Sequence, residues 1–422
     1  MDNSRNNDLR DLIKDSIEGA SAFNMRDTLT QDYVPKKLPG REKQLREMAI
    51  DFRDLFIYPG SVSVRVVLTG KTGTGKTVIA RKFGEYLVEI GKEKNLRIVY
   101  AHINCYKQRT LYLALTEVAR QINLSVPNRG LSAQELFKNI HDYLEKKKMF
   151  VIIVFDEFDY LINTAPIEDI YLLARTYDEL GTTTKRINYI FIIRDLSTLV
   201  GLDSSIKESI IKNVIDFPPY TSTQLYEILK ERVIEEKSFR EGAINDNVLT
   251  FIAHINGIDT GGSGNARVAI ETLELAGKIA DSEGAPVVTI DYAKKAINQI
   301  NPEAIMLSDI IKELDLHQLL ILKSIINLKK REKMDMLPTG LVEEEYKKIA
   351  TNMNIKPRRH TQVFEYIRRL KTMGIIITRQ SGRGMRGRTT LISLSAPISN
   401  DIDIIITKEI EEKINNEIEE EI

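Results

Sequence analysis

Apolar and polar residues alternate in two distinct ways along the first half of the chain. Between about Tyr33 and Tyr220, short β-branched runs are separated by stretches with helical periodicity. This alternation is typical of βαβ units, in which helices cover a parallel sheet. We predict four strands: Val62–Thr69, Leu96–Asn104, Met149–Phe155 and Ile187–Ile193.

A second region, from Thr221 to about Asn301, shows helical periodicity only. This periodicity is broken at Ile255-Asn256-Gly257 and again at the glycine-rich segment 261–264. Because no strand pattern appears here, we predict a separate helical region.

A third pattern begins at Leu307. Two helices are predicted before Pro357 and a third over Arg358–Met373, and a hairpin follows. The hairpin consists of a strand at Ile375–Arg379, a Gly/Arg loop at Ser381–Gly387 and a strand at Thr389–Leu394. Three helices followed by a β-hairpin is the order of a winged helix-turn-helix, a DNA-binding fold.

The last residues carry one apolar stripe. Isoleucine recurs every four residues at Ile406, Ile410, Ile414, Ile418 and Ile422. This spacing predicts a helix with a single apolar face. We interpret it as a helix packed on its own protein, with a partner-binding helix as the less favoured alternative.

Composition limits the class of protein. The chain has 422 residues, 42% hydrophobic and 28% charged, which favours a soluble protein of more than one domain. Charges interrupt every apolar stretch well short of the ~20 residues that cross a bilayer. The N-terminus does not resemble a secretory signal, so we expect a cytoplasmic, nucleoid-associated protein without a membrane partner. Cys105 is the only cysteine, which excludes an internal disulfide and a zinc cluster.

A net charge of zero conceals an uneven distribution. Residues 356–389 contain ten Lys or Arg and one acid, Glu365, whereas residues 400–422 contain nine acids and two lysines. A basic module followed by an acidic tail is therefore masked by the sum.

A nucleotide-binding motif follows the first predicted strand. The sequence Gly70-Lys71-Thr72-Gly73-Thr74-Gly75-Lys76-Thr77 fits the P-loop pattern, and a helix is predicted over Thr77–Ile90. Backbone N–H groups and the helix N-terminus bind phosphates in such loops. We expect ATP or ADP with Mg²⁺ here. Lys76 would contact the β- and γ-phosphates, the Thr77 hydroxyl would bind the metal, and Val78 would complete the site.

Two acids end the third predicted strand. The apolar run 150–155 delivers Asp156 and Glu157 to the sheet edge. We expect Asp156 to hold Mg²⁺ through its waters and Glu157 to activate the attacking water. Taken alone, the pair is weak evidence, because two acids could simply be a solvated strand end. On the third strand of a P-loop fold, it fits a Walker B motif.

Arg267 opens a helix in the helical region. We expect its guanidinium to reach the γ-phosphate. A surface arginine at a helix start is the alternative interpretation.

Candidate DNA contacts gather in the basic module. Arg358, Arg359, Thr361 and Gln362 begin the third helix, where such folds contact bases in the major groove. Arg383, Arg386 and Arg388 lie in the hairpin loop among glycines. A charged run is usually a solvated face, but ten positive charges against one favour duplex DNA.

These motifs, in this order, resemble the archaeal origin-recognition and cell-division-cycle initiator family of AAA+ ATPases over nearly the whole chain. Besides the motifs above, the resemblance rests on six segments: 33–42, 102–112, 128–132, 217–220, 264–267 and 316–319. It implies an α/β fold, a P-loop AAA+ parallel sheet with a helical lid and a C-terminal winged helix. The implied division is an N-terminal extension (1–32), an AAA+ base (33–220), a lid (221–302), a winged helix (303–398) and an acidic tail (399–422).

The resemblance also implies roles for further residues. It places Val34, Pro35 and Arg41 near the adenine and Tyr220 at the lid junction of the nucleotide site. Asn128 and Arg129 lie where the family carries a DNA-contacting insertion. Proteins of this family bind replication origins as ATP-loaded units and help load the replicative helicase. Expected partners are therefore duplex DNA, the helicase and initiator paralogues.

Two positions depart from the family pattern. Arg194 stands where the family has an asparagine that holds the attacking water. Ser205 stands where it tends to have an arginine finger, whose loss can cost ~10³-fold in turnover. The catalytic candidates are Glu157, Asp156, Lys76 and Arg267. We nevertheless predict slow or negligible turnover with nucleotide binding retained.

The leading interpretation is an ATP-binding replication initiator that recognises origin DNA through its winged helix and AAA+ insertion. The alternative is a divergent paralogue acting as an ATP-regulated, sequence-specific transcriptional regulator, because a winged helix does not settle function. A motor or remodelling ATPase is least favoured, since Ser205 argues against a finger-dependent ring.

Overall fold

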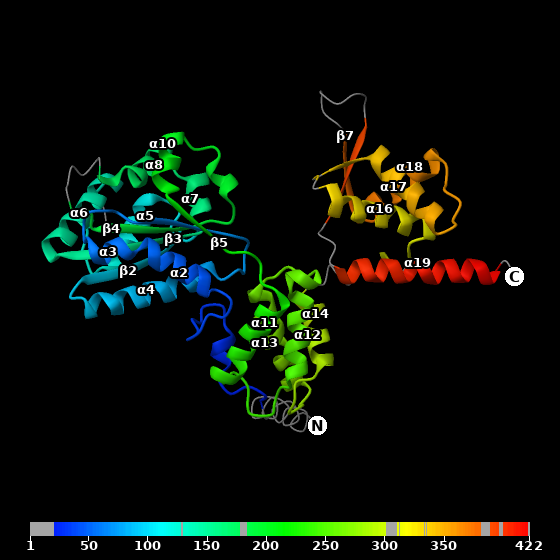
Figure 1. Ribbon diagram of the computed structural model, residues 1–422, viewed down its shortest axis with the longest axis horizontal. Helices are drawn as coiled ribbons and strands as arrows, with labels where there is room; N and C mark the ends of the chain where they lie inside the picture. Colours follow the sequence, from blue (N-terminus) through cyan, green and yellow to red (C-terminus); the bar gives the residue numbers. More distant parts are fainter. Residues whose placement is uncertain are drawn as a thin grey trace, which may run out of the picture. The chain divides into compact units, whose positions relative to one another are not determined.

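The computed structural model describes residues 21–127, 130–177, 184–300, 310–311, 313–332, 334, 336–380, 389–395 and 400–420. Its internal contacts divide the chain into two compact units (Figure 1). The first consists of Met1–Asp259 with Ser263–Ile290, and the second of Thr260–Gly262 with Asp291–Ile422.

A parallel sheet forms the centre of the first unit. Its strand order is β2-β3-β4-β1-β5, and every pairing between neighbouring strands is parallel. The strands are β1 (Arg65–Thr69), β2 (Arg97–Asn104), β3 (Met149–Asp156), β4 (Ile187–Ile192) and β5 (Asn213–Asp216). The carboxyl ends of parallel strands share one edge, so the P-loop after β1 and the acids after β3 lie on the same side of the sheet.

Helices cover both faces of this sheet (Figure 1). One face packs against α2 (Glu42–Asp51), α3 (Arg53–Ile57) and α4 (Lys76–Glu93). The other packs against α5 (Leu111–Gln121), α6 (Ala133–Lys147), α7 (Phe158–Thr164), α8 (Ile167–Ala174) and α10 (Ser204–Ile210). Two 3₁₀ turns, η1 (Arg26–Leu29) and η2 (Leu196–Leu199), also belong to this unit.

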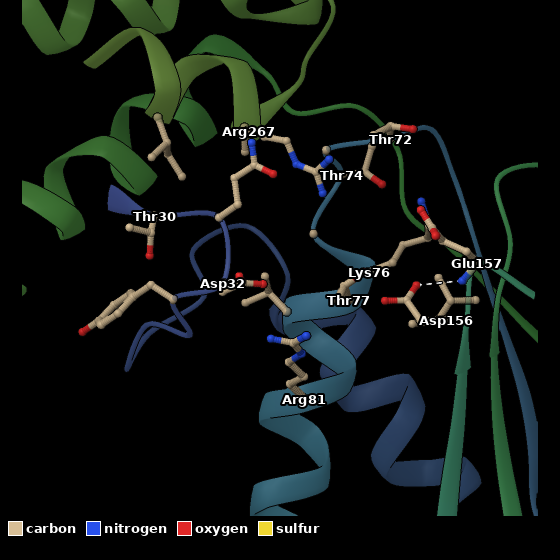
Figure 2. A pocket seen from close by; sticks show the side chains of 18 of the residues that line it. Thr30, Asp32, Thr72, Thr74, Lys76, Thr77, Arg81, Asp156, Glu157 and Arg267 are labelled. Atoms are coloured by element: carbon tan, nitrogen blue, oxygen red, sulfur yellow. Dashed lines mark hydrogen bonds between the residues drawn. The ribbon is translucent and has the colours of Figure 1, made fainter. Parts of the chain in front are cut away.

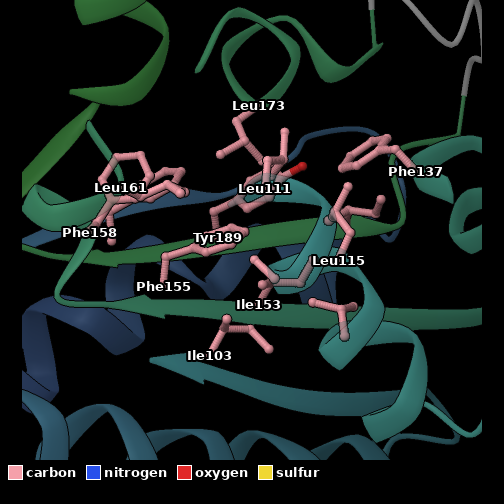
Figure 3. Close-up of a cluster of buried hydrophobic side chains, with 14 of the residues drawn as sticks. Ile103, Leu111, Leu115, Phe137, Ile153, Phe155, Phe158, Leu161, Leu173 and Tyr189 are labelled. Carbon is pink, nitrogen blue, oxygen red and sulfur yellow. The ribbon is translucent and has the colours of Figure 1, made fainter. Parts of the chain in front are cut away.

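Aromatic side chains form the centre of the second face. Phe155, Tyr189 and Phe191 stack across β3 and β4, with ring centroids 5.5–6.3 Å apart. Figure 3 shows Phe155 and Tyr189 in this cluster. Phe158 packs on Phe191 at 4.6 Å. All four rings are almost completely buried. This packing holds the end of β3, where the two acids emerge, in a fixed position.

Four of the five strands were predicted from the sequence. The exception is β5, which has a single buried position, Ile215, among three exposed residues. A four-residue edge strand without alternation gives no clear pattern. β1 also begins at Arg65 rather than at the predicted Val62.

The rest of the first unit is helical. It contains α11 (Ser222–Lys230), a π-helical turn η3 (Glu231–Glu235), α12 (Asp246–Asn256) and α13 (Ala266–Ser282). The 3₁₀ turn η4 (Ile258–Thr260) ends at Thr260, the first residue assigned to the second unit. Thr221 and Gln224 form a reciprocal capping box that begins α11. The N-terminal segment also packs here, because Ser21 and Ala22 donate to Asp281 at 2.6 Å.

The second unit is a winged helix. α16 (Leu316–Glu332), α17 (Thr339–Asn352) and α18 (His360–Thr372) precede an antiparallel pair, β7 (Ile376–Gln380) and β8 (Thr390–Leu394). The short β6 (Leu337–Pro338) completes a sheet of order β6-β8-β7. α14 (Ile290–Ile300) begins at the boundary of the two units. The predicted order of three helices and a hairpin is thus confirmed.

The tail forms α19 (Asn400–Glu420) and packs on its own unit. Ile406 and Ile410 are fully buried against the winged-helix core, and Lys323 of α16 donates to Asp403 at 2.7 Å. The interpretation of a self-packed helix is confirmed for these residues. Across the described ranges, every helix is too short or too polar to span a bilayer.

Candidate nucleotide site and nucleic-acid interface

The P-loop curls between β1 and α4. Gly73 and Gly75 have φ of +78° and +89°, in the left-handed region that favours glycine. A Cβ at Gly73 would collide with the side chain of Asn265, and one at Gly75 with the hydroxyl of Tyr220. Both glycines therefore permit a bend and a close approach of neighbouring segments.

Lys76 is turned into the loop. Its Nζ donates to the carbonyl of Gly70 and to that of Lys71 at 2.8 Å. Burial lowers the pKa of Lys76 to about 8, against the opposing effect of Asp156. Both partners of this buried ammonium are neutral carbonyl oxygens. An anionic phosphate group would therefore be a better partner for Lys76.

Asp156 is held by three neighbours at the end of β3. Its Oδ1 accepts the backbone N–H of Glu157 at 2.9 Å, and its Oδ2 lies 3.2 Å from His102 Nε2. The Thr77 hydroxyl donates to the same carboxylate. Burial acts to raise the pKa of Asp156, but the bonds from His102 and Thr77 outweigh it and the pKa is lowered. The carboxylate is therefore kept ionised beside a hydroxyl oxygen.

This oxygen pair fits Mg²⁺. Hydroxyl and carboxylate oxygens are the protein ligands that Mg²⁺ accepts, the rest being water and phosphate. Within the described ranges no group of three or more His, Cys, Asp or Glu side chains could hold a metal by itself. A metal bound by Thr77 and Asp156 would therefore need phosphate and water to complete its shell.

Arg194 follows the end of β4 and faces the acids. Its Nη2 lies 3.8 Å from Glu157 Oε1, and its Nε 3.8 Å from Asp159 Oδ2. β4 lies between β1 and β3, so its carboxyl end points between the P-loop and the acids. The residue that departs from the family pattern is thus located at the nucleotide site.

These residues line a cavity of about 370 Å³. In Figure 2, Lys76, Thr77, Asp156 and Glu157 meet at one end, and Arg267 approaches from the helical region. Of the predicted nucleotide contacts, ten line the cavity: Thr72, Gly73, Thr74, Gly75, Lys76, Thr77, Val78, Asp156, Glu157 and Arg267. The predicted contacts outside its lining are Val34, Pro35, Arg41, Gly70, Lys71 and Tyr220.

Of the N-terminal residues in the wall opposite the acids, only Tyr33 belongs to a segment identified from the sequence. This wall consists of the N-terminal residues Leu29, Thr30, Gln31, Asp32 and Tyr33, facing Ile270, Glu271 and Glu274 of α13. The Tyr33 hydroxyl donates to Glu236 at 2.5 Å, and Arg232 lies over the Tyr33 ring. The cavity lining thus includes Tyr33, the first residue of the segment 33–42, but not Val34 or Pro35. Thr30, Gln31 and Asp32 are polar residues without periodicity, so the sequence gave no signal for them.

Arg41 lies behind the P-loop and is almost completely buried. Its Nε donates to the Thr74 carbonyl at 3.0 Å and its Nη2 to the Pro218 carbonyl at 2.6 Å. Its guanidinium lies 3.7 Å from the centre of the Tyr220 ring. Burial lowers the pKa of Arg41, against the opposing effect of Tyr220. In the structure Arg41 braces the loop from outside the cavity.

Arg267 is joined to the P-loop through its neighbours. Asn265 Oδ1 caps α13 by accepting from the N–H groups of Arg267 and Val268. The Ala266 N–H donates to the Gly73 carbonyl at 3.1 Å. The start of α13 therefore rests on the loop, and the exposed Arg267 side chain extends toward it (Figure 2).

Ser205 has an arginine beside it. Arg175 Nη2 donates to Ser205 Oγ at 2.7 Å, and both side chains are at the surface of this unit.

The candidate DNA contacts lie in the second unit. Arg358, Arg359, Thr361 and Gln362 are exposed around the start of α18. Arg368, Arg369 and Lys371 continue its exposed side. The predicted contacts Asn128, Arg129, Arg383, Arg386 and Arg388 lie outside the described residues.

The fold and the site define a class: a P-loop ATPase of the AAA+ type that carries a winged helix. Three sequence profiles match consecutive parts of the chain. They are described as AAA domain (residues 65–195), Cdc6 AAA+ ATPase-type lid domain (226–298) and CDC6 C-terminal winged helix domain (309–403).

Known relatives identify the family. An ORC1-type DNA replication protein 2 from Sulfurisphaera tokodaii is 60% identical over 407 residues, covering 96% of this chain and 97% of its own. The structure of the Aeropyrum pernix ORC2 protein, solved with ADPNP and ADP, is 25% identical in sequence and has a TM-score of 0.65. The match covers 93% of this chain and 100% of the ORC2 chain. The structure of the Aeropyrum pernix ORC1 protein in complex with DNA is 28% identical in sequence and has a TM-score of 0.59. The match covers 92% of this chain and 97% of the ORC1 chain. The chain belongs to the ORC1/Cdc6-type family of DNA replication initiators, as the motifs predicted.

Proposed function

We propose that this protein is an ATP-regulated replication initiator that binds duplex DNA at origins. The observation that carries the proposal is the cavity, because it joins the P-loop and Asp156 of the sheet to Arg267 of the helical region. Its volume of about 370 Å³ falls in the range of ligand sites. Structures of an ORC2 relative with ADPNP and ADP support an adenine nucleotide as the occupant.

Mg²⁺ is the metal we propose for this site, held by Thr77 and by Asp156 through water. When bound, it would neutralise charge on the phosphates. Lys76 and Arg267 would bind the β- and γ-phosphates from opposite sides. Since Arg267 begins α13, loss of the γ-phosphate would remove one of its partners. We propose that the position of α13 therefore depends on the nucleotide.

Glu157 is the candidate base, but it is not free. Its carboxylate lies 3.8 Å from Arg194 Nη2, and a carboxylate oriented toward a guanidinium is not oriented toward an attacking water. We therefore propose that ATP acts mainly as a bound ligand, with slow turnover.

Exposed cationic and polar side chains at the start of α18 support a duplex-DNA partner. The ORC1 relative solved with DNA supports it as well. We propose base contacts from Arg359, Thr361 and Gln362, and backbone contacts from Arg383, Arg386 and Arg388. The insertion at Asn128 and Arg129 would make a second contact. The replicative helicase and initiator paralogues are further proposed partners. We propose that the protein acts on the chromosome in the cytoplasm.

A binding experiment tests this function. DNA affinity of the full chain would be measured with origin, promoter and random duplexes, each with ATP, ADP or no nucleotide. We expect preference for origin DNA and a difference between ATP and ADP. Preference for promoters would favour the regulator alternative. Absence of both nucleotide and DNA binding at physiological salt would overturn the proposal.

A further inference from the structure

The imidazole of His317, on α16, accepts a hydrogen bond from Arg358, an exposed arginine just before α18. Arg358 lies two residues before α18, and its Nε donates to His317 Nε2 at 2.8 Å. His317 sits in the first turn of α16 and is 7% exposed, whereas Arg358 is exposed. Both belong to the second unit. A buried ring therefore fixes one edge of a guanidinium that is open to solvent.

The ring itself is fixed by two tyrosines. His317 Nδ1 lies 2.8 Å from the hydroxyl of Tyr346, which also accepts the backbone N–H of Arg358 at 2.9 Å. The Tyr366 ring stacks on the imidazole, with centroids 6.0 Å apart and planes 22° apart. Tyr346 is fully buried. The orientation of the imidazole is thus set from α17 and α18.

The partners also set the tautomer. A guanidinium has no acceptor, so the imidazole nitrogen facing Arg358 Nε must be unprotonated. The single ring proton is then on Nδ1 and is donated to Tyr346. Burial and the charge of Arg358 lower the pKa of His317, against the opposing effect of Asp315. The neutral ring, which alone provides this acceptor, is therefore favoured.

We propose that His317 is a positioning residue for DNA recognition, holding Arg358 by its Nε edge so that its two Nη groups face duplex DNA. The inference rests on the proposed DNA-binding function. With Nε engaged, the outer edge presents two parallel N–H donors, which match a phosphate or the O6 and N7 atoms of guanine. Fixing the side chain beforehand reduces the entropy lost on binding.

Two substitutions of the same histidine separate positioning from packing. The amide of glutamine lies near the place of Nε2, so His317→Gln keeps an acceptor for Arg358. The shorter asparagine lies near Nδ1, so His317→Asn keeps a partner for Tyr346 and releases Arg358. Affinity of the full chain for a labelled mixed-sequence duplex would be measured by fluorescence anisotropy at several salt concentrations.

We expect Arg358→Ala to weaken binding by about tenfold, a typical loss for a bidentate arginine. His317→Asn should weaken it by a smaller factor, and His317→Gln should bind as the wild type does. In the Arg358→Ala background, His317→Asn should have no further effect, because the two residues act as one unit. A further loss in that background would overturn the inference.

The salt dependence identifies what Arg358 contacts. A phosphate contact predicts that Arg358→Ala reduces the slope of log affinity against log salt by about 0.9. An unchanged slope, with a loss reproduced by 7-deazaguanine in the duplex, marks the guanine edge. If Arg358→Ala binds as the wild type does, the inference is wrong while DNA binding by the protein stands. If the wild type binds no DNA, the proposed function itself fails.

A pH profile gives a readout that packing alone would not change. Protonated His317 has no acceptor for Arg358, so wild-type affinity should fall at acidic pH relative to His317→Gln. That variant carries every other titratable group, including Asp315, Tyr346, Tyr366 and the exposed His360. Gln318→Ala, a buried neighbour on α16, is the stability control and should lower the melting temperature without changing DNA affinity. Identical pH profiles for wild type and His317→Gln would refute the positioning role.

Discussion

Arg194 Nη2 lies 3.8 Å from Glu157 Oε1 at the edge of the nucleotide cavity. The same guanidinium approaches Asp159 Oδ2 at 3.8 Å. At this distance each ion pair is loose, and the guanidinium lies beside the candidate base in the lining of the cavity. A Glu157 carboxylate held toward Arg194 would favour an ATP-bound state over hydrolysis.

Replacing Arg194 by asparagine should therefore raise turnover. Removing the guanidinium leaves the Glu157 carboxylate free to orient toward an attacking water, and a working general base contributes roughly 10²–10⁴-fold. We expect the rate of phosphate release with saturating DNA to increase by at least about tenfold, which is less than the full contribution of a general base. Glu157→Gln added to Arg194→Asn should abolish the gain. If the variant hydrolyses ATP no faster than the wild type, Arg194 is not the residue that slows hydrolysis.

Nucleotide affinity should depend on pH through Lys76. Its pKa of about 8 means that the ammonium is charged below this pH and increasingly neutral above it. A triphosphate favours the charged form, so above pH 8 binding takes up a proton and affinity falls by up to about tenfold per pH unit. Calorimetry at pH 9 in buffers of different ionisation enthalpy would measure the uptake. Lys76→Met should bind weakly and take up no such proton.

Removing Arg41 should destabilise the first unit and weaken nucleotide binding together. Its guanidinium satisfies the Thr74 and Pro218 carbonyls, so Arg41→Ala leaves both without that donor. We expect unfolding to become easier by about 2–4 kcal/mol, from lost charged hydrogen bonds and lost packing on Tyr220. Thermal denaturation with and without ATP would measure both effects. Arg46→Ala, at an exposed position of α2, should change neither.

Base and backbone contacts in the winged helix should respond differently. Gln362→Ala or Arg359→Ala should alter sequence preference more than overall affinity, because we propose that these exposed side chains at the start of α18 contact base edges. Arg386→Ala should weaken binding to all duplexes and reduce the salt slope by about one. Selection from a random pool, with affinity measured at several salt concentrations, distinguishes the two. An unchanged slope for Arg386→Ala would remove the wing from the DNA contacts.

The acidic tail should stabilise the winged helix. Ile410 is fully buried between α19 and the core of its unit, so Ile410→Ala should cost about 2–4 kcal/mol of folding free energy. Lys408→Ala, on the exposed side of α19, is the matched control. Denaturant unfolding of the full chain would compare them. Equal stability of the two variants would indicate that α19 is not part of the folded core.

Parts of the fold with strong local patterns were predictable. β3 is buried at all eight positions, and the P-loop has a fixed spacing, so both were identified from neighbouring residues alone. The short edge strand β5 and the cavity wall at 29–33 have no comparable pattern. The resemblance placed Arg41 near the adenine, but the contacts of its guanidinium with the Thr74 and Pro218 carbonyls could not be predicted, because motif order does not specify on which side of the loop a side chain lies.

The sequence by itself determined the order of the motifs, the class of fold, the phosphate-binding loop and the basic helix that precedes an acidic tail. Only the tertiary structure brought His102 to Asp156, Arg194 to Glu157 and His317 to Arg358. Periodicity fixes which face of an element is apolar, whereas a side-chain contact of about 3 Å depends on strand register and helix packing. These are set by the whole core, so residues distant in sequence meet only when it has formed.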